Sequence, residues 1–148
     1  MPISKICLTD VNIWLALVAE GHEQHRAART WFLSLGEGEA LFCRVSQMGF
    51  LRLLTQPAVM KQGVLNPEAA WKTYVLLRQE PRVAFAGEPM GIEATWVRLM
   101  RGATGSHTWT DAYLAAFAIG HKYTLVSFDR EFRRWKDLSF RLLVSSPH

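Results

Sequence analysis

KICLTDVNIWLALV, residues 5–18, contains a short apolar run followed at once by a helical pattern. Lys5 to Thr9 is typical of a buried strand, and Val11 to Val18 places apolar residues at the spacing of a helix. Asp10 stands at the junction, where an aspartate commonly caps the helix that follows. A strand that passes directly into a helix is typical of α/β folds.

The rest of the chain continues this alternation of strands and helices. The further predicted strands are Ala40 to Cys43, Arg82 to Ala86, Tyr123 to Ser127 and Phe140 to Val144. The further predicted helices are His22 to Leu35, Val45 to Leu54, Pro67 to Gln79, Met90 to Met100 and Thr110 to Gly120, the last ended by its glycine. This pattern predicts one α/β domain over residues 1–148, with a mainly parallel sheet of about five strands flanked by helices on both faces.

The composition is that of one ordinary globular domain. A chain of 148 residues buries roughly 68–70% of its unfolded surface, which suffices for a single core. Hydrophobic residues make up 49% and charged residues 20%, which argues against a disordered or membrane protein. Met1 to Thr9 lacks the hydrophobic region of a signal peptide, so we expect a cytoplasmic protein without a membrane partner. The net charge of +4 permits a nucleic-acid partner.

Several common catalytic patterns are missing from the sequence. Cys7 and Cys43 form no C-x-x-C pair and lie in strand-like runs, so we expect two buried thiols. The five histidines show no metal-binding spacing, and neither a P-loop nor a G-x-S-x-G element is present. These observations argue against zinc sites, nucleotide triphosphatases and serine hydrolases.

Three aspartates and one glutamine stand where a polar side chain is directed inward. Asp10, Gln47 and Asp111 each precede apolar residues at i+3, i+4 and i+7, which places them at the head of an apolar stripe. Asp129 follows the strand predicted at Tyr123 to Ser127. Ligands of parallel sheets bind beyond the carboxyl ends of the strands, where Asp10 and Asp129 both lie. Because burial of unpaired carboxylates is costly, these residues together predict a site for a divalent metal ion.

Each of the aspartates also has a simpler interpretation. Asp10 and Asp129 can cap the helical segments that follow them. Asp111 lies in the first turn of its helix, where the helix dipole favours a negative charge by about 0.3–1 kcal/mol. Capping and metal binding do not exclude each other, and the joint placement of the residues favours the metal site.

Four segments in a fixed order resemble one known family. They are TDVN at residues 9–12, RVSQMGFLRLLT at 44–55, TDAYLAA at 110–116 and LVSFDREF at 125–132. Together they resemble the PIN-domain ribonucleases and, more narrowly, the VapC-type toxins of prokaryotic toxin–antitoxin pairs. The resemblance extends over nearly the whole chain.

The resemblance implies a Mg²⁺- or Mn²⁺-dependent endoribonuclease that cleaves structured RNA such as tRNA or rRNA. It also implies a homodimer that is inhibited by a small VapB-type antitoxin. By position, Asp10, Asp111 and Asp129 match the acidic metal ligands of the family. Asn12 and Ser127 match polar residues that support them.

Gln47 departs from the family pattern, because the family usually has glutamate at this position. Glutamine offers a carbonyl oxygen but no charge, so we expect weaker metal binding with similar geometry. The alternative is a PIN-fold module that has lost catalysis and binds RNA or an antitoxin. Arg44 and Arg130 flank the acidic motifs and are candidates for contacts with RNA phosphates, although solvated surface charges are the simpler interpretation.

Overall fold

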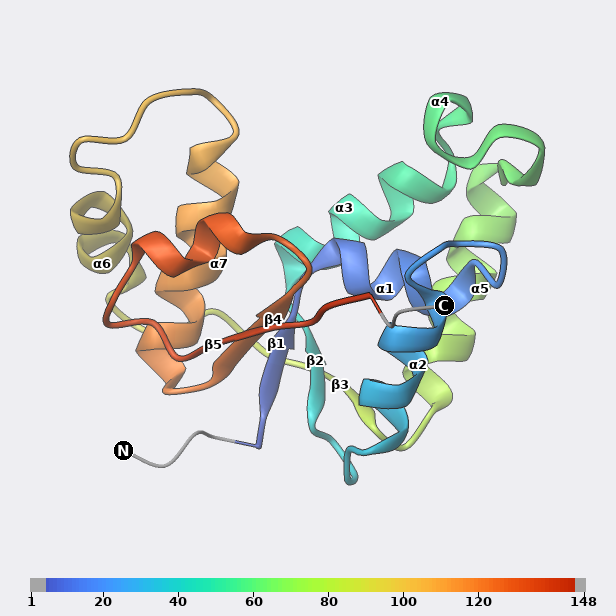
Figure 1. Ribbon diagram of the computed structural model, residues 1–148, viewed down its shortest axis with the longest axis horizontal. Coiled ribbons are helices and arrows are strands. Elements are labelled where there is room, and N and C mark those ends of the chain that lie inside the picture. Colours follow the sequence, from blue (N-terminus) through green and yellow to red (C-terminus); the bar gives the residue numbers. More distant parts are fainter. Residues whose placement is uncertain (1–4, 146–148) are drawn as a thin grey trace.

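A parallel sheet of five strands lies at the centre of the molecule (Figure 1). The computed structural model describes residues 5–145. The strands are β1 (Cys7–Thr9), β2 (Ala40–Phe42), β3 (Val83–Phe85), β4 (Thr124–Ser127) and β5 (Phe140–Leu142). All four pairings are parallel, in the order β3-β2-β1-β4-β5. The predicted α/β class and sheet are confirmed.

The strand order reverses at β1. The chain moves outward from β1 to β2 and β3 on one side, and then crosses over to β4 and β5 on the other. Leu8 of β1 is therefore in register with both Leu41 of β2 and Leu125 of β4. The crevice of an open parallel sheet forms at such a reversal, beyond the carboxyl ends of the strands. The topology thus places a binding site beyond the ends of β1 and β4.

Helices cover both faces of the sheet (Figure 1). The α-helices are α1 (Val11–Val18), α2 (His25–Leu33), α3 (Arg44–Leu54), α4 (Pro57–Met60), α5 (Pro67–Gln79), α6 (Ile92–Leu99) and α7 (Thr108–His121). Two 3₁₀ segments are η1 (Lys61–Gly63) and η2 (Arg130–Arg134). One face of the sheet packs against α1, α2, α3 and α5, and the other against α6 and α7. Within residues 5–145, no helix has the length and apolar character needed to cross a membrane.

Alternating strand residues build two apolar cores, because successive side chains point to opposite faces of a sheet. Cys7 and Val126 belong to the core beneath α1, α2, α3 and α5, whereas their neighbours Leu8 and Leu125 belong to the core beneath α7. In the first core the Trp14 ring stacks on Phe42, with 3.9 Å between ring centroids. The two cores pack against both faces of the sheet and so position the loops at its carboxyl edge.

The structure confirms most of the predicted elements and corrects some of their ends. Cys7 and Cys43 are buried free thiols, as predicted. The prediction that Gly120 ends its helix was wrong, because α7 continues to His121 and Lys122 takes the left-handed conformation, with φ at 61°. Gly120 instead permits close packing, since a Cβ there would lie 2.9 Å from Pro89 Cγ.

Two further differences concern helix starts. The helix predicted from His22 begins only at His25, because residues 19–24 form turns between α1 and α2. Pro57 ends α3 as expected but then occupies the first turn of the short helix α4, which the sequence did not predict. Proline is well suited to that position because its fixed φ matches the helix and its missing N–H is not needed there.

Candidate functional site

Asp10 and Asp129 lie at the carboxyl ends of the adjacent strands β1 and β4, as the sequence predicted. Asp10 caps α1, with its Oδ1 accepting a hydrogen bond of 2.7 Å from the Val11 amide. Asp129 caps η2, with its Oδ1 accepting a hydrogen bond of 2.9 Å from the Glu131 amide. Both capping interpretations are confirmed. The caps fix one oxygen of each carboxylate at the edge of the crevice and leave further lone pairs for a ligand.

The buried Ser127 hydroxyl connects the two strand ends. It donates a hydrogen bond of 2.7 Å to Asp10 Oδ2 and accepts one of 2.9 Å from the Asp129 amide. Asn12 Nδ2 donates to the same hydroxyl oxygen at 3.1 Å, and Asn12 Oδ1 accepts from the Phe128 amide at 3.4 Å. Asn12 and Ser127 therefore join α1 to β4 and hold Asp10 and Asp129 side by side, as expected for supporting residues.

Three carboxylates converge next to this network, and we refer to Asp111, Asp129 and Glu131 as the acidic cluster. Each offers an oxygen atom, and these oxygens lie within 4.8 Å of one another. Oxygens on opposite sides of one Mg²⁺ ion are about 4.2 Å apart, since each Mg–O bond is about 2.1 Å. Oxygens at adjacent positions of the octahedron are about 3.0 Å apart, so the three carboxylates would move closer together to bind one cation directly. The donor set fits Mg²⁺ or Mn²⁺, which prefer oxygen ligands.

Glu131 is a functional candidate that sequence reasoning missed. It lies in the basic segment REFRR at residues 130–134, where no apolar stripe marks it, and its side chain is exposed. The signal that could have found it is local: Asp129 and Glu131 form a D-x-E pair directly after a buried strand. Because Asp129 has extended backbone and η2 turns tightly, the two side chains reach the same space.

The pKa values of two aspartates at the site, Asp10 and Asp111, are raised. Burial raises the pKa of Asp10 above its ordinary value, and the charge of Asp129 adds to this, while the Ser127 and Val11 hydrogen bonds oppose it. Burial raises the pKa of Asp111 to about 6, with further contributions from the charges of Asp10 and Asp129. Asp10 thus lies within electrostatic reach of the acidic cluster, although its oxygens are outside the group of three. The mutual repulsion favours binding of a cation.

Two basic side chains partly balance this charge. Arg134 Nη2 lies 3.8 Å from Asp111 Oδ2 and 3.3 Å from Glu131 Oε2. His107 Nε2 lies 3.8 Å from Glu131 Oε2. Both lower the pKa of Asp111, but burial and the neighbouring aspartates outweigh them. The site therefore keeps an excess of negative charge that a divalent ion can neutralise.

The Gln47 side chain forms a hydrogen bond with a neighbouring arginine. It is buried on α3, and its Oε1 accepts a hydrogen bond of 2.6 Å from Arg44 Nη1. The Arg44 guanidinium also lies 4.8 Å from the centre of the Phe85 ring, so it is held from two sides. Arg130 is exposed at the start of η2 and forms no ion pair with any residue between 5 and 145. The two predicted phosphate-binding arginines thus differ, since only Arg130 has a free guanidinium.

Comparison with known proteins agrees with the fold. The PIN domain family model matches residues 7–138. The chain is 39% identical over 143 residues to Ribonuclease VapC41 of Mycobacterium tuberculosis, covering 93% of this chain and 98% of that protein.

Solved structures with little sequence identity share the fold. VapBC2 from Rickettsia felis, bound to a DNA fragment from their promoter, superposes with a TM-score of 0.66 at 12% identity, covering 94% of this chain and 99% of that chain. VapC20 of Mycobacterium tuberculosis, described as a sarcin-ricin loop cleaving toxin, gives a TM-score of 0.64 at 18% identity over 86% of this chain and 93% of that chain. Taken with the family match and the close relative, these findings show that the chain belongs to the PIN-domain family, as a member of its ribonuclease VapC group.

Proposed function

We propose that this protein is a divalent-metal-dependent endoribonuclease, the toxin of a VapBC-type toxin–antitoxin pair, and that it cleaves structured RNA such as tRNA or rRNA. The observation that carries the proposal is the convergence of Asp111, Asp129 and Glu131 oxygens next to Asp10 in the crevice between β1 and β4. Membership in the ribonuclease VapC group supports the choice of RNA as substrate.

Asp10, Asp111 and Asp129 are the proposed catalytic residues, with Glu131 as a further metal ligand. A bound Mg²⁺ or Mn²⁺ ion supplies an activated water for attack on phosphorus and stabilises negative charge on the leaving oxygen. The three aspartates would hold this cation. Hydrogen bonds from the Val11 amide and Ser127 fix the Asp10 carboxylate, and one from the Glu131 amide fixes that of Asp129. Asn12 supports Ser127 from α1.

Gln47 is proposed to act through Arg44 and not as a charged ligand. Similarity to the ribonucleases of the VapC group argues against the alternative of a catalytically impaired binding module. The Gln47 amide fixes Arg44 at the carboxyl end of β2. There, Arg44 can bind RNA phosphate through its remaining N–H groups, and Arg130 can do so from η2.

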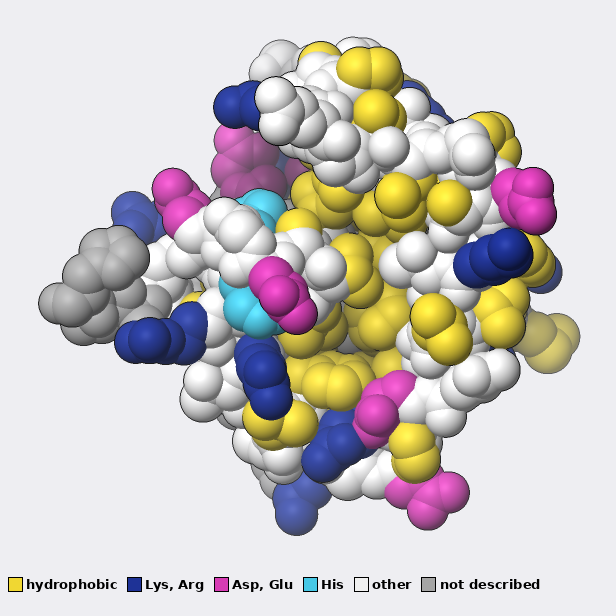
Figure 2. Space-filling model, turned by 90° about the vertical axis from the view of Figure 1, so that its right-hand side faces the viewer, with side chains coloured by type: hydrophobic (Ala, Val, Ile, Leu, Met, Phe, Trp, Pro, Cys, Tyr) yellow, Lys and Arg dark blue, Asp and Glu magenta, His cyan; other side chains and the backbone are white. Residues whose placement is uncertain are grey.

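A VapB-type antitoxin is the proposed protein partner, and the protein is proposed to act as a cytoplasmic homodimer. Structures similar to this chain include VapBC complexes, among them VapBC-1 from nontypeable Haemophilus influenzae. On this chain, α5 exposes Trp71, Val75 and Leu76, and α2 exposes Leu33. Hydrophobic side chains gather around a hollow on the side where α2 and α5 lie (Figure 2). A surface of this kind suits an apolar helix of a small partner.

The test is cleavage of total cellular RNA by the purified protein with Mg²⁺ or Mn²⁺, beside a sample with chelator and the variant Asp129→Asn. We expect defined products only from the unchanged protein with metal. The proposed VapB-type antitoxin, co-purified with the protein, is expected to suppress cleavage. Intact RNA in every sample, with the protein folded and free of partner, would contradict the proposal.

A further inference from the structure

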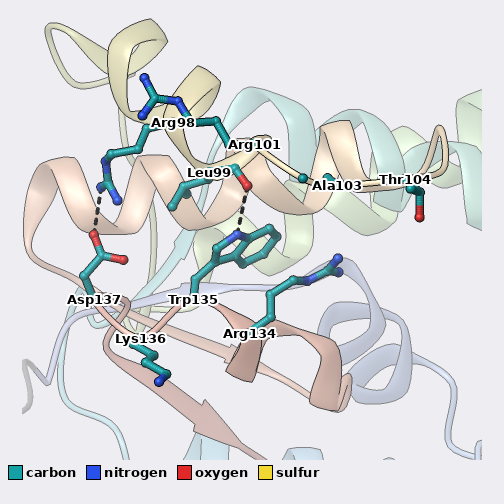
Figure 3. Close-up of a pocket in the computed structure, with 10 residues that line it drawn as sticks. Arg98, Leu99, Arg101, Ala103, Thr104, Arg134, Trp135, Lys136 and Asp137 are labelled. Atoms are coloured by element: carbon teal, nitrogen blue, oxygen red, sulfur yellow. Dashed lines mark hydrogen bonds and ion pairs between the residues drawn. The ribbon is translucent and has the colours of Figure 1, made fainter.

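A basic cavity of about 500 Å³ lies next to the acidic cluster, between the end of α6 and the segment that follows η2 (Figure 3). Its walls include Arg98 and Arg101, the loop residue Thr104, and Arg134, Trp135 and Lys136. We call this space the basic cavity. Its volume is within the range of pockets that hold small ligands.

Arg134 belongs to both the basic cavity and the acidic cluster. Its guanidinium stacks over the Trp135 ring at 4.5 Å and also faces the carboxylates of Asp111 and Glu131. Trp135 is nearly buried, and its Nε1 donates a hydrogen bond of 3.1 Å to the Leu99 carbonyl. In Figure 3 Arg134 extends beneath the loop that carries Ala103 and Thr104. The Trp135 ring, held by this hydrogen bond, therefore positions the Arg134 guanidinium where it borders both the basic cavity and the acidic cluster.

The basic cavity carries an excess of positive charge. Four of its lining residues are cationic, and Asp137 is the one acidic residue among them. Asp137 pairs with Arg98 at 2.7 Å (Figure 3). Arg101 and Lys136 are exposed at the rim and form no ion pair with any residue of the described part, 5–145. Their long side chains are therefore available to an anion that enters the cavity.

We propose that the basic cavity binds a phosphate of the RNA substrate adjacent to the phosphate that is cleaved; this inference rests on the function proposed above. A phosphodiester suits the cavity because guanidinium groups form paired, charge-assisted hydrogen bonds with phosphate oxygens. The Arg134 guanidinium lies close to the acidic cluster and also lines the basic cavity. The cleaved phosphate and the phosphate in the cavity would therefore lie on opposite sides of this side chain. The RNA backbone therefore runs from the crevice between β1 and β4 toward the loop after α6.

The test is binding of a fluorescein-labelled RNA hairpin, followed by anisotropy in chelator at several salt concentrations. The double variant Arg101→Gln/Lys136→Gln is compared with Arg26→Gln/Arg29→Gln, which removes the same charge from exposed positions on α2. We expect the cavity variant to bind about tenfold more weakly, and its plot of log affinity against log salt to be less steep by about 1 to 2. The α2 variant is expected to bind like the unchanged protein.

The proposal would be overturned if the two double variants bound RNA with the same affinity and the same salt dependence, whether or not both bound more weakly than the unchanged protein. Thermal unfolding of each variant establishes that it is folded, and since all four positions are exposed, little change in Tm is expected. Cleavage of RNA by the unchanged protein with Mg²⁺ is measured in parallel. If the unchanged protein cleaves RNA and the cavity variant binds RNA as tightly as it does, the phosphate site in the basic cavity is refuted and the nuclease function stands. If the unchanged protein does not cleave RNA, the proposed nuclease function is refuted.

Discussion

Replacement of Ser127 by alanine is expected to loosen the junction between β1 and β4. The buried hydroxyl donates to Asp10 and accepts from Asn12 and from the Asp129 amide. A hydrogen bond to a charged group contributes about 1.5–3 kcal/mol, and the two N–H groups lose their buried acceptor. We therefore expect the free energy of unfolding to fall by about 3 kcal/mol, measured by urea denaturation at pH 7.5.

The same substitution is expected to weaken metal binding. The Ser127 hydrogen bond lowers the pKa of Asp10, so its loss makes the Asp10 carboxylate a stronger proton binder and leaves its position less fixed. If the Mg²⁺ dissociation constant rises about tenfold, the stabilisation by a fixed Mg²⁺ concentration falls by about 1.4 kcal/mol. The assay is the same denaturation series with and without Mg²⁺, at a fixed concentration about one hundredfold above the dissociation constant of the unchanged protein.

Ser46→Ala is the matched control. Ser46 is also fully buried, but its hydroxyl bonds only the Cys43 backbone and thiol at the start of α3. This variant is expected to lose about 1–2 kcal/mol of stability while keeping the full stabilisation by Mg²⁺. Identical Mg²⁺ stabilisation of the Ser127 variant and the unchanged protein would refute the assignment of Ser127 as the residue that orients the carboxylates.

Three further predictions concern residue 47, pH and helix packing. Gln47→Glu adds a negative charge near the site and is expected to tighten Mn²⁺ binding a few-fold, about 1 kcal/mol, in a calorimetric titration; unchanged affinity would contradict this. The pKa of Asp111, raised by burial to about 6, lies above its ordinary value of 3.8, so the folded state binds this proton more tightly than the unfolded state. The metal-free protein should therefore lose about 1 kcal/mol of stability from this group as the pH rises from 4 to 7, and Mg²⁺ affinity should fall as the pH drops below 6. In pH-dependent melting, Asp111→Asn should reduce both effects, and Asp10, whose pKa is also raised, should account for the remainder. A Cβ on Gly49 would lie 2.9 Å from Val11 Cγ2, so Gly49→Ala should cost about 1–3 kcal/mol in urea denaturation, and adding Val11→Ala should recover part of it if this clash is the cause.

The fold was largely predictable because its strong signals are local. Buried strands such as Cys7–Thr9 and Thr124–Ser127 are short apolar runs, and α1 and α3 carry clear apolar stripes. The end of α7 was not predictable, because Gly120 is required by contact with Pro89, which is distant in sequence. Such a contact leaves no periodic pattern in the chain.

The candidate site was predicted in part for a similar reason. Asp10 and Asp129 follow strands, and the topology of a parallel sheet brings strand ends together. Gln47 shares the apolar-stripe pattern, yet its amide is directed to Arg44, since a pattern fixes which side of a helix a residue occupies but not its hydrogen-bond partner. Glu131 carries no such pattern and joins the cluster only through the tight turn of η2.

The most direct test of the central claim is calorimetric titration of the RNA-free protein with Mn²⁺. The account predicts saturable binding that weakens at least about tenfold in Asp111→Asn, Asp129→Asn and Glu131→Gln. Glu37→Gln, at an exposed turn before β2, is the control and should bind like the unchanged protein. Equal Mn²⁺ affinity in all of these proteins would contradict the assignment of the acidic cluster as the metal site.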